Sequence, residues 1–151
     1  MAFPFIPGEQ VAVPEIPFKA DVRLPAARTA VIVVDMQNDF VKPGGTLVVP
    51  AAAETIGNIQ QLLAAARAKG VHVAYTQDTH YEGDLEWKIW PEHCRAGTHG
   101  WEIIDELKPQ AGDLVCPKSR YDGFYDTSLD HYLTRVWQVE NGSLLRKLAG
   151  D

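Results

Sequence analysis

Cysteine, positive charge and long apolar runs are all scarce in this sequence. Its 151 residues include 2 cysteines, Cys94 and Cys116. A single possible pair excludes a disulfide framework, so we expect reduced thiols in a cytoplasmic protein. The formal net charge of −6 offers no attraction for nucleic acid or for an anionic membrane. No apolar run approaches the roughly 18 residues of a membrane span, so neither kind of partner is expected.

The N-terminal region is rich in proline and has no positively charged signal-like start. Because proline fixes φ and removes a backbone donor, we predict an extended arm over residues 1–28. Apolar side chains along the arm leave two interpretations open, a loose leader or an arm that packs on the domain or on a neighbouring subunit. The second makes a homo-oligomer the expected assembly. The remaining chain divides into a domain over residues 29–141 and a divergent tail over residues 142–151.

Short β-branched runs alternate with helical patterns along the domain. The predicted strands are Thr29 to Val34, Val71 to Thr76 and Asp113 to Pro117, and the predicted helices are Ala52 to Lys69 and Thr127 to Val136. Continuous apolar strands are typical of a parallel sheet that is covered on both faces. The alternation therefore predicts an α/β fold with a doubly wound, mostly parallel sheet.

Three chemically useful side chains follow the ends of the predicted strands, namely Asp35, Asp78 and Lys118. The carboxyl ends of parallel strands meet at one edge of a sheet, where ligand sites form. An Asp35–Lys118 pair there could hold a proton-accepting carboxylate and a cation beside a reacting carbonyl. The alternatives are an aspartate that caps a loop and a lysine on the surface.

A second group of polar residues indicates a metal site. Asp78 and His80 are two apart and can point into one site from an extended segment, and the long loop over residues 77–100 can return His93 to them. One carboxylate and two imidazoles are a common ligand set for Zn²⁺, Mn²⁺ or Fe²⁺, with open positions for water or ligand. The alternative is a hydrogen-bonded pair within the loop.

Six ordered motifs carry a resemblance to a known family. They are VVDMQNDF at 33–40, PGG at 43–45, DTH at 78–80, WPEHC at 90–94, GTHG at 97–100, and Lys118 with Gly123 and Phe124. Together they resemble the nicotinamidase branch of the isochorismatase-like cysteine hydrolases, over about residues 29–135. The family is a sheet flanked by helices whose nicotinamidase members convert nicotinamide to nicotinate and ammonia.

The resemblance implies a role for each candidate residue. Asp35 would be the general base and Lys118 its charged partner, while a divalent metal held by Asp78, His80 and His93 would orient the substrate. Phe40 and Trp90 match positions that wall the ring of a small aromatic amide, and core packing is the alternative for both. We therefore expect an amide hydrolase of nicotinamidase type.

The family's nucleophile does not have a counterpart in the motifs. In the family it is a cysteine at a helix N-terminus, after a fourth strand downstream of the lysine. Here residues 142–151 have no strand-like pattern, and their leucines indicate a short helical segment. We therefore expect a sheet truncated after the third strand–helix unit, with the edge of the Thr29 to Val34 strand bare, and a chain that is inactive by itself.

Three other functions remain open from the sequence. The chain could be a non-catalytic descendant that binds a metal or a pyridine-like ligand, or a fragment that another chain completes. It could also be a structural module whose helices and arm mediate assembly.

Overall fold

The computed structural model describes the backbone of residues 23–146 and the side chains of residues 23–140. Most of the predicted arm lies outside the described residues, and its last part, Ala26–Arg28, is a single 3₁₀ turn. No helix in the described part of the chain is long and apolar enough to cross a membrane.

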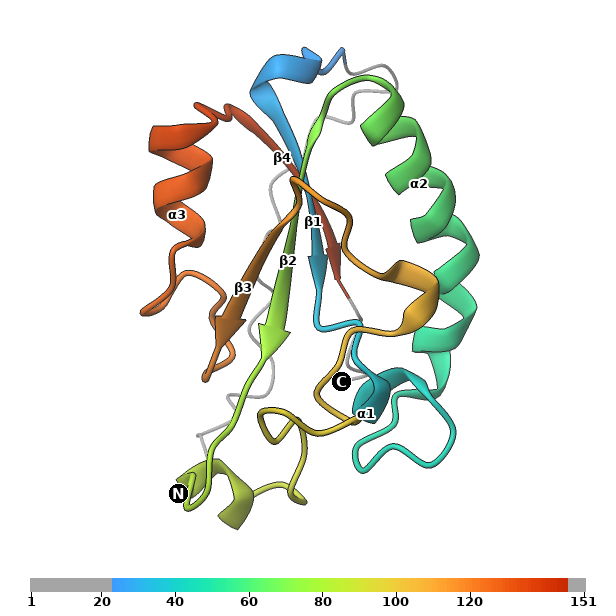
Figure 1. Ribbon diagram of the computed structural model, residues 1–151, viewed down its shortest axis with the longest axis vertical. Coiled ribbons are helices and arrows are strands. Elements are labelled where there is room, and N and C mark those ends of the chain that lie inside the picture. The colour runs from blue at the N-terminus through green and yellow to red at the C-terminus, as the bar shows by residue number, and fades with distance from the viewer. Residues whose placement is uncertain (1–22, 147–151) are drawn as a thin grey trace, which may run out of the picture.

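Four parallel strands form the sheet, in the order β3-β2-β1-β4. They are β1 (Thr29–Val34), β2 (His72–Asp78), β3 (Leu114–Lys118) and β4 (Asn141–Arg146). Figure 1 shows the strands side by side, with their carboxyl ends at the same end of the molecule. The predicted α/β fold with a doubly wound parallel sheet is confirmed.

The prediction of a helical tail and a bare β1 edge is wrong, because β4 pairs with β1 along its whole length. The register runs from Thr29↔Asn141 to Val34↔Arg146. The N–H and C=O groups along a buried strand edge need hydrogen-bond partners. Backbone pairing can satisfy them with little dependence on the side chains of the neighbouring strand. The leucine spacing that indicated a helix was therefore overridden by a tertiary contact.

Helices cover both faces of the sheet. The helix α2 (Ile56–Ala68), which follows a 3₁₀ segment at Pro50–Thr55, lies on one side. The helix α3 (Leu129–His131) continues into a π-helical turn at Tyr132–Val136 and lies on the other side (Figure 1). Both predicted helices are confirmed, with α2 beginning later than expected. The short α1 (Asn38–Val41) follows β1 at the carboxyl edge.

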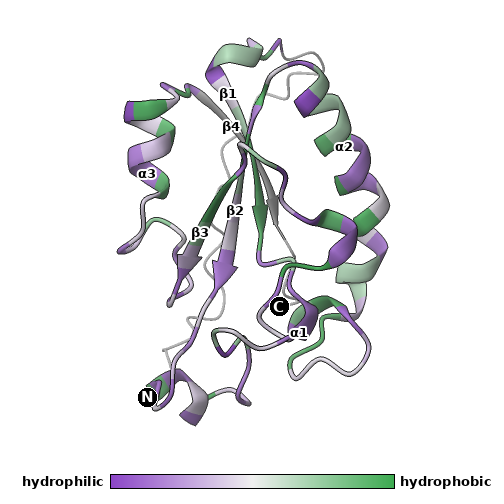
Figure 2. Ribbon diagram, viewed as in Figure 1, coloured by the Kyte–Doolittle hydropathy of each residue, from purple (hydrophilic) through white to green (hydrophobic). Residues whose placement is uncertain are grey.

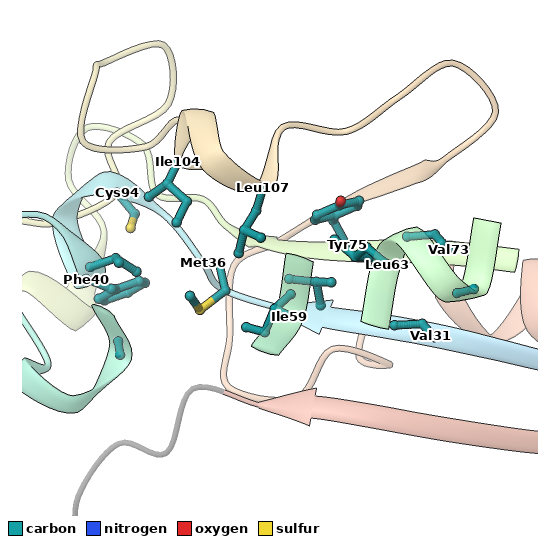
Figure 3. Packing of buried hydrophobic residues seen from close by; sticks show 14 residues of the cluster. Val31, Met36, Phe40, Ile59, Leu63, Val73, Tyr75, Cys94, Ile104 and Leu107 are labelled. Carbon is teal, nitrogen blue, oxygen red and sulfur yellow. The ribbon is translucent and has the colours of Figure 1, made fainter. Parts of the chain in front are cut away.

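The core consists of two clusters, one on each face of the sheet. On the α2 side, Val31 and Val33 pack with Ile59 and Leu63, as Figure 3 shows for the labelled residues of this cluster. On the α3 side, Ile32 packs with smaller partners from the neighbouring strands and with the helix. Alternate residues of β1 thus pack on opposite faces, which explains why most of this strand has a hydrophobic colour in Figure 2.

Candidate active site and metal centre

The carboxyl edge of the sheet brings the predicted site residues together. Asp35 follows β1 directly, while Asp78 and Lys118 are the last residues of β2 and β3 and are register partners. The strands β1, β2 and β3 are neighbours in the sheet, so their ends deliver three ionisable groups to one place.

Lys118 lies between the two aspartates. Its Nζ is 3.0 Å from Asp35 Oδ2 and 3.1 Å from Asp78 Oδ1, and its side chain is 4% exposed. A third hydrogen bond goes to the carbonyl of Arg120. Burial alone lowers the pKa of Lys118, but the two carboxylates outweigh it, and the pKa is raised above its ordinary value. Lys118 is therefore a permanent cation that links the two acids.

Asp35 is held by several contacts in an unusual backbone conformation. Its φ is 53°, in the left-handed region that few residues other than glycine adopt. Its Oδ1 accepts a hydrogen bond from the Thr76 hydroxyl (2.9 Å), and its Oδ2 faces Lys118. Both oxygens thus have a partner, and strain of this kind persists only where surrounding contacts enforce it. The orientation of the carboxylate at the sheet edge is thus fixed by Thr76 and Lys118.

Asp78, His80 and His93 form a buried cluster with the geometry of a metal centre. One ligand atom from each residue lies within 4.8 Å of the others. Asp78 Oδ2 is 3.1 Å from His80 Nε2 and 3.3 Å from His93 Nε2. Burial raises the pKa of Asp78, but the contacts with His93, Lys118 and His80 outweigh it and hold the pKa at about 2. The carboxylate is thus ionised.

The outer nitrogens of both imidazoles have acceptors, which is the pattern expected of metal-binding histidines. His80 Nδ1 is 2.9 Å from Asp84 Oδ2, and His93 Nδ1 is 2.7 Å from the Pro91 carbonyl. A proton on Nδ1 leaves the lone pair of Nε2 directed at the cluster. The backbone N–H of Glu86 and the contact with His80 hold the pKa of Asp84 at about 2, so this outer partner is also an anion. The donor set fits Zn²⁺, Mn²⁺ or Fe²⁺.

Gln37 fixes the backbone of the shared ligand. It is fully buried, and its Oε1 accepts from the Asp78 N–H (2.7 Å) while its Nε2 donates to the carbonyls of Asp78 and Trp101 (both 2.8 Å). Sequence reasoning missed Gln37, Thr76 and Asp84. Only Gln37 had a signal, since it lies within the motif that follows the first strand.

A cavity of about 200 Å³ opens beside the aspartate–lysine pair on the α3 side of the sheet. It is lined by Ile32, Val34, Thr76, Lys118, Tyr121, Asp122, Gly123, Phe124 and Leu129.

Neither predicted ring-binding residue is among the residues that line this cavity. Phe40 is 4% exposed, belongs to the core, and has its ring centroid 5.7 Å from that of His93. Trp90 is 42% exposed, and its Nε1 donates to the Tyr121 hydroxyl at the cavity wall. Sequence reasoning missed Tyr121 as a lining residue.

Neither cysteine lines this cavity. Cys94 is fully buried in the α2-side cluster with Phe40 (Figure 3). Cys116 is 1% exposed under α3, with Sγ 3.5 Å from the Ser128 hydroxyl. Burial raises the pKa of the Cys116 thiol, an effect that the contact with Ser128 only partly offsets. A buried thiol of this kind is a poor nucleophile.

Comparison with known proteins places the chain in a family. The model of the isochorismatase domain matches residues 29–138, so the chain belongs to the isochorismatase family. Ureidoacrylate amidohydrolase RutB of Serratia proteamaculans is 37% identical over 131 residues, which are 70% of this chain and 53% of the relative. The chain spans about half the length of the curated relatives it matches.

Similar solved structures indicate the same family and cover a larger share of this chain. The N-carbamoylsarcosine amidase of Thermoplasma acidophilum is 39% identical, with a TM-score of 0.72 over 78% of this chain and 66% of that one. The pyrazinamidase of Pyrococcus horikoshii, solved in complex with zinc, is 29% identical, with a TM-score of 0.71 over 78% of this chain and 69% of that one. The predicted family is confirmed. Ureidoacrylate amidohydrolases are among the curated relatives, so the comparisons support an amidase family without selecting nicotinamide.

Proposed function

We propose that this edge of the sheet is the acid–lysine and metal-binding part of an amide-hydrolase site of nicotinamidase type. Its substrate would be nicotinamide or a related small planar amide. The observation that carries the proposal is Lys118, which joins the candidate base Asp35 to the metal-ligand candidate Asp78 within 3.1 Å on each side. Lys118 is buried between these two candidate site residues and thereby links the candidate base to the metal-ligand cluster.

The proposed roles follow from the contacts of each residue. Asp35 accepts a proton from the attacking group and returns it to the departing amine, because Thr76 and Lys118, which line the cavity, hold it in a fixed orientation. Lys118 is paired with Asp35 and stabilises negative charge that develops on the amide oxygen. A divalent ion held by Asp78, His80 and His93 supplies a positive charge that can orient a ring nitrogen or a polar substituent.

The side chains that wall the substrate differ from those predicted. We propose Tyr121 and Phe124 as the ring-binding residues because they line the cavity. Trp90 would contribute indirectly through its hydrogen bond to Tyr121. The homo-oligomer and the cytoplasmic location remain predictions.

A second candidate is favoured by the burial of both cysteines. Amide hydrolysis by this family chemistry needs a thiolate beside the base, and Cys94 and Cys116 are 0% and 1% exposed outside the cavity. The second candidate is therefore a chain that binds a metal and a small ligand without turnover. A related alternative is that another polypeptide completes the active site, in which case the assembly would be catalytic.

The metal centre can be tested directly with the purified chain. We expect one Zn²⁺, Mn²⁺ or Fe²⁺ ion per chain, with a stabilisation of about 2.7 kcal/mol at a metal concentration 100 times Kd. His93→Gln should lose most of this stabilisation because it removes one of three ligands. The measurement is thermal unfolding with and without metal, together with metal analysis. His131→Gln, at an exposed histidine on α3, is the matched control. Equal stabilisation of His93→Gln and the unmodified chain would contradict the proposed centre.

A further inference from the structure

A buried carboxylate outside the proposed base and metal ligands connects two loops around the site. Asp39, in α1, is 8% exposed. Its Oδ1 accepts from the Thr46 N–H (3.2 Å), and its Oδ2 accepts from the Cys94 N–H (2.8 Å). Both oxygens of one side chain are thus bound to backbone from two separate loops.

Two glycines let these loops approach Asp39 closely. A Cβ on Gly100 would lie 2.3 Å from both carboxylate oxygens of Asp39, and the Asp39 N–H donates to the Gly100 carbonyl (3.0 Å). A Cβ on Gly45 would lie 2.4 Å from the Asp39 carbonyl oxygen. These glycines belong to the PGG and GTHG motifs. Gly100 therefore leaves room for the Asp39 carboxylate, and Gly45 leaves room for the Asp39 backbone.

Cys94 connects the carboxylate to the proposed metal ligands. It follows His93 directly, and its φ of 46° is a left-handed conformation that a non-glycine residue keeps only under constraint. Its N–H is bound to Asp39, and its carbonyl accepts from the His80 N–H (3.0 Å). The residue after one proposed metal ligand is thus hydrogen-bonded to the backbone of another.

We propose that Asp39 is a positioning residue for the metal centre. Its carboxylate holds Cys94 in the left-handed conformation, and that conformation fixes where His93 Nε2 lies relative to Asp78 and His80. The inference rests on the proposed metal site, because it concerns the affinity of that site. Asp39 itself is not part of the ligand cluster, which consists of Asp78, His80 and His93, and its two oxygens face the N–H groups of Thr46 and Cys94.

The first test is Asp39→Asn, which keeps the shape of the side chain. Its amide NH₂ must face one of the two backbone N–H groups, so one hydrogen bond is lost and replaced by a contact between donors. We expect metal affinity to fall about 10–100-fold, as is typical when an outer partner of a ligand is changed. The measurements are competition with a chelator and the visible spectrum of the Co²⁺-loaded chain, which reports ligand geometry.

Asp113→Asn is the matched control. The Asp113 side chain is 8% exposed and also accepts a backbone N–H, from Gln110, but it pairs with Arg67 away from the cluster. It should lose stability and keep its metal affinity and Co²⁺ spectrum. An Asp39→Asn variant with unchanged affinity would overturn the inference alone, whereas an unmodified chain that binds no metal would overturn the proposed centre and the inference together.

A rescue experiment separates positioning from general loss of structure. Adding Cys94→Gly to Asp39→Asn removes the strain of the left-handed conformation, because glycine adopts it without penalty. We expect the double variant to recover part of the lost affinity, and no recovery would count against the proposed route.

If Asp39→Asn does not fold, Gly100→Ala replaces it as the test, since the added Cβ displaces the Asp39 carboxylate from Cys94. A Gly100→Ala variant with full affinity would overturn the inference.

Discussion

Lys118→Met is expected to lower the free energy of unfolding by about 3–5 kcal/mol, the usual cost of removing one partner from a buried ion pair. Methionine has a similar length and no charge. It would leave Asp35 and Asp78 side by side at the strand ends without the cation that is 3.0 and 3.1 Å from them. Urea unfolding at neutral pH, in the presence of a chelator, measures the effect. A loss below about 1 kcal/mol would contradict it, because that is the range of an exposed pair.

Two matched experiments make this prediction specific. Lys108→Met removes a lysine that is 76% exposed and 4.0 Å from its partner Asp105, so its effect should be near zero. Adding a divalent metal should recover part of the Lys118→Met loss, since the ion would neutralise Asp78. Metal that stabilises the variant no more than the unmodified chain would argue against a ligand role for Asp78.

The pH dependence of the same variant has a definite sign. The folded pKa of Asp78 is about 2, below its ordinary value of 3.8. Its ionised contacts therefore stabilise the fold above about pH 4, and this stability is lost as the pH falls from about 4 towards 2. The difference in the free energy of unfolding between Lys118→Met and the unmodified chain should become smaller over this range, because protonated carboxyls no longer repel each other. A difference that grows as the pH falls would show that the lysine acts in another way.

The positions of the candidate site residues could be predicted from sequence because they depend on one strong rule. Asp35, Asp78 and Lys118 each end a buried parallel strand, and parallel strands place their ends at a common edge. The cluster with His80 and His93 was predicted for the same reason, since a long loop had to return to that edge. Hydrophobic patterning also predicted a sheet covered on both faces, because β1 is apolar on both faces.

Other features depended on contacts that local sequence does not encode. The β4 segment has no strand pattern, and its conformation follows from the open edge of β1. Phe40 and Trp90 are both aromatic in motifs, yet one packs in the core and the other is part-exposed, a difference set by the path of the loops. From the sequence, Asp39 was only one residue of a motif and had no predicted role. Its role becomes visible when Cys94 and Gly100 are seen against it.

Hydrolysis of nicotinamide by the 151-residue chain is expected to be undetectable, despite the proposed base and cation. Rate acceleration by this chemistry needs a thiolate that Asp35 can reach. Cys94 lies in the α2-side core, and Cys116 lies under α3 with a raised thiol pKa. Without a cysteine nucleophile, water would have to attack the amide. Water is a weak nucleophile, and only charge stabilisation would assist its attack.

Ammonia release from nicotinamide and from a ureido-type amide, by metal-loaded chain after repeated purification, measures this prediction. Turnover that is lost in Cys116→Ser or Cys94→Ser would contradict it and identify the nucleophile. Turnover that survives in both but is lost in Asp35→Asn would indicate direct attack by water. Metal-dependent binding of nicotinamide without ammonia release would favour the non-catalytic candidate. In that case Asp35 and Lys118 would contribute to the charge and the stability of a binding site, because Lys118 holds two strand ends together whether or not a reaction follows.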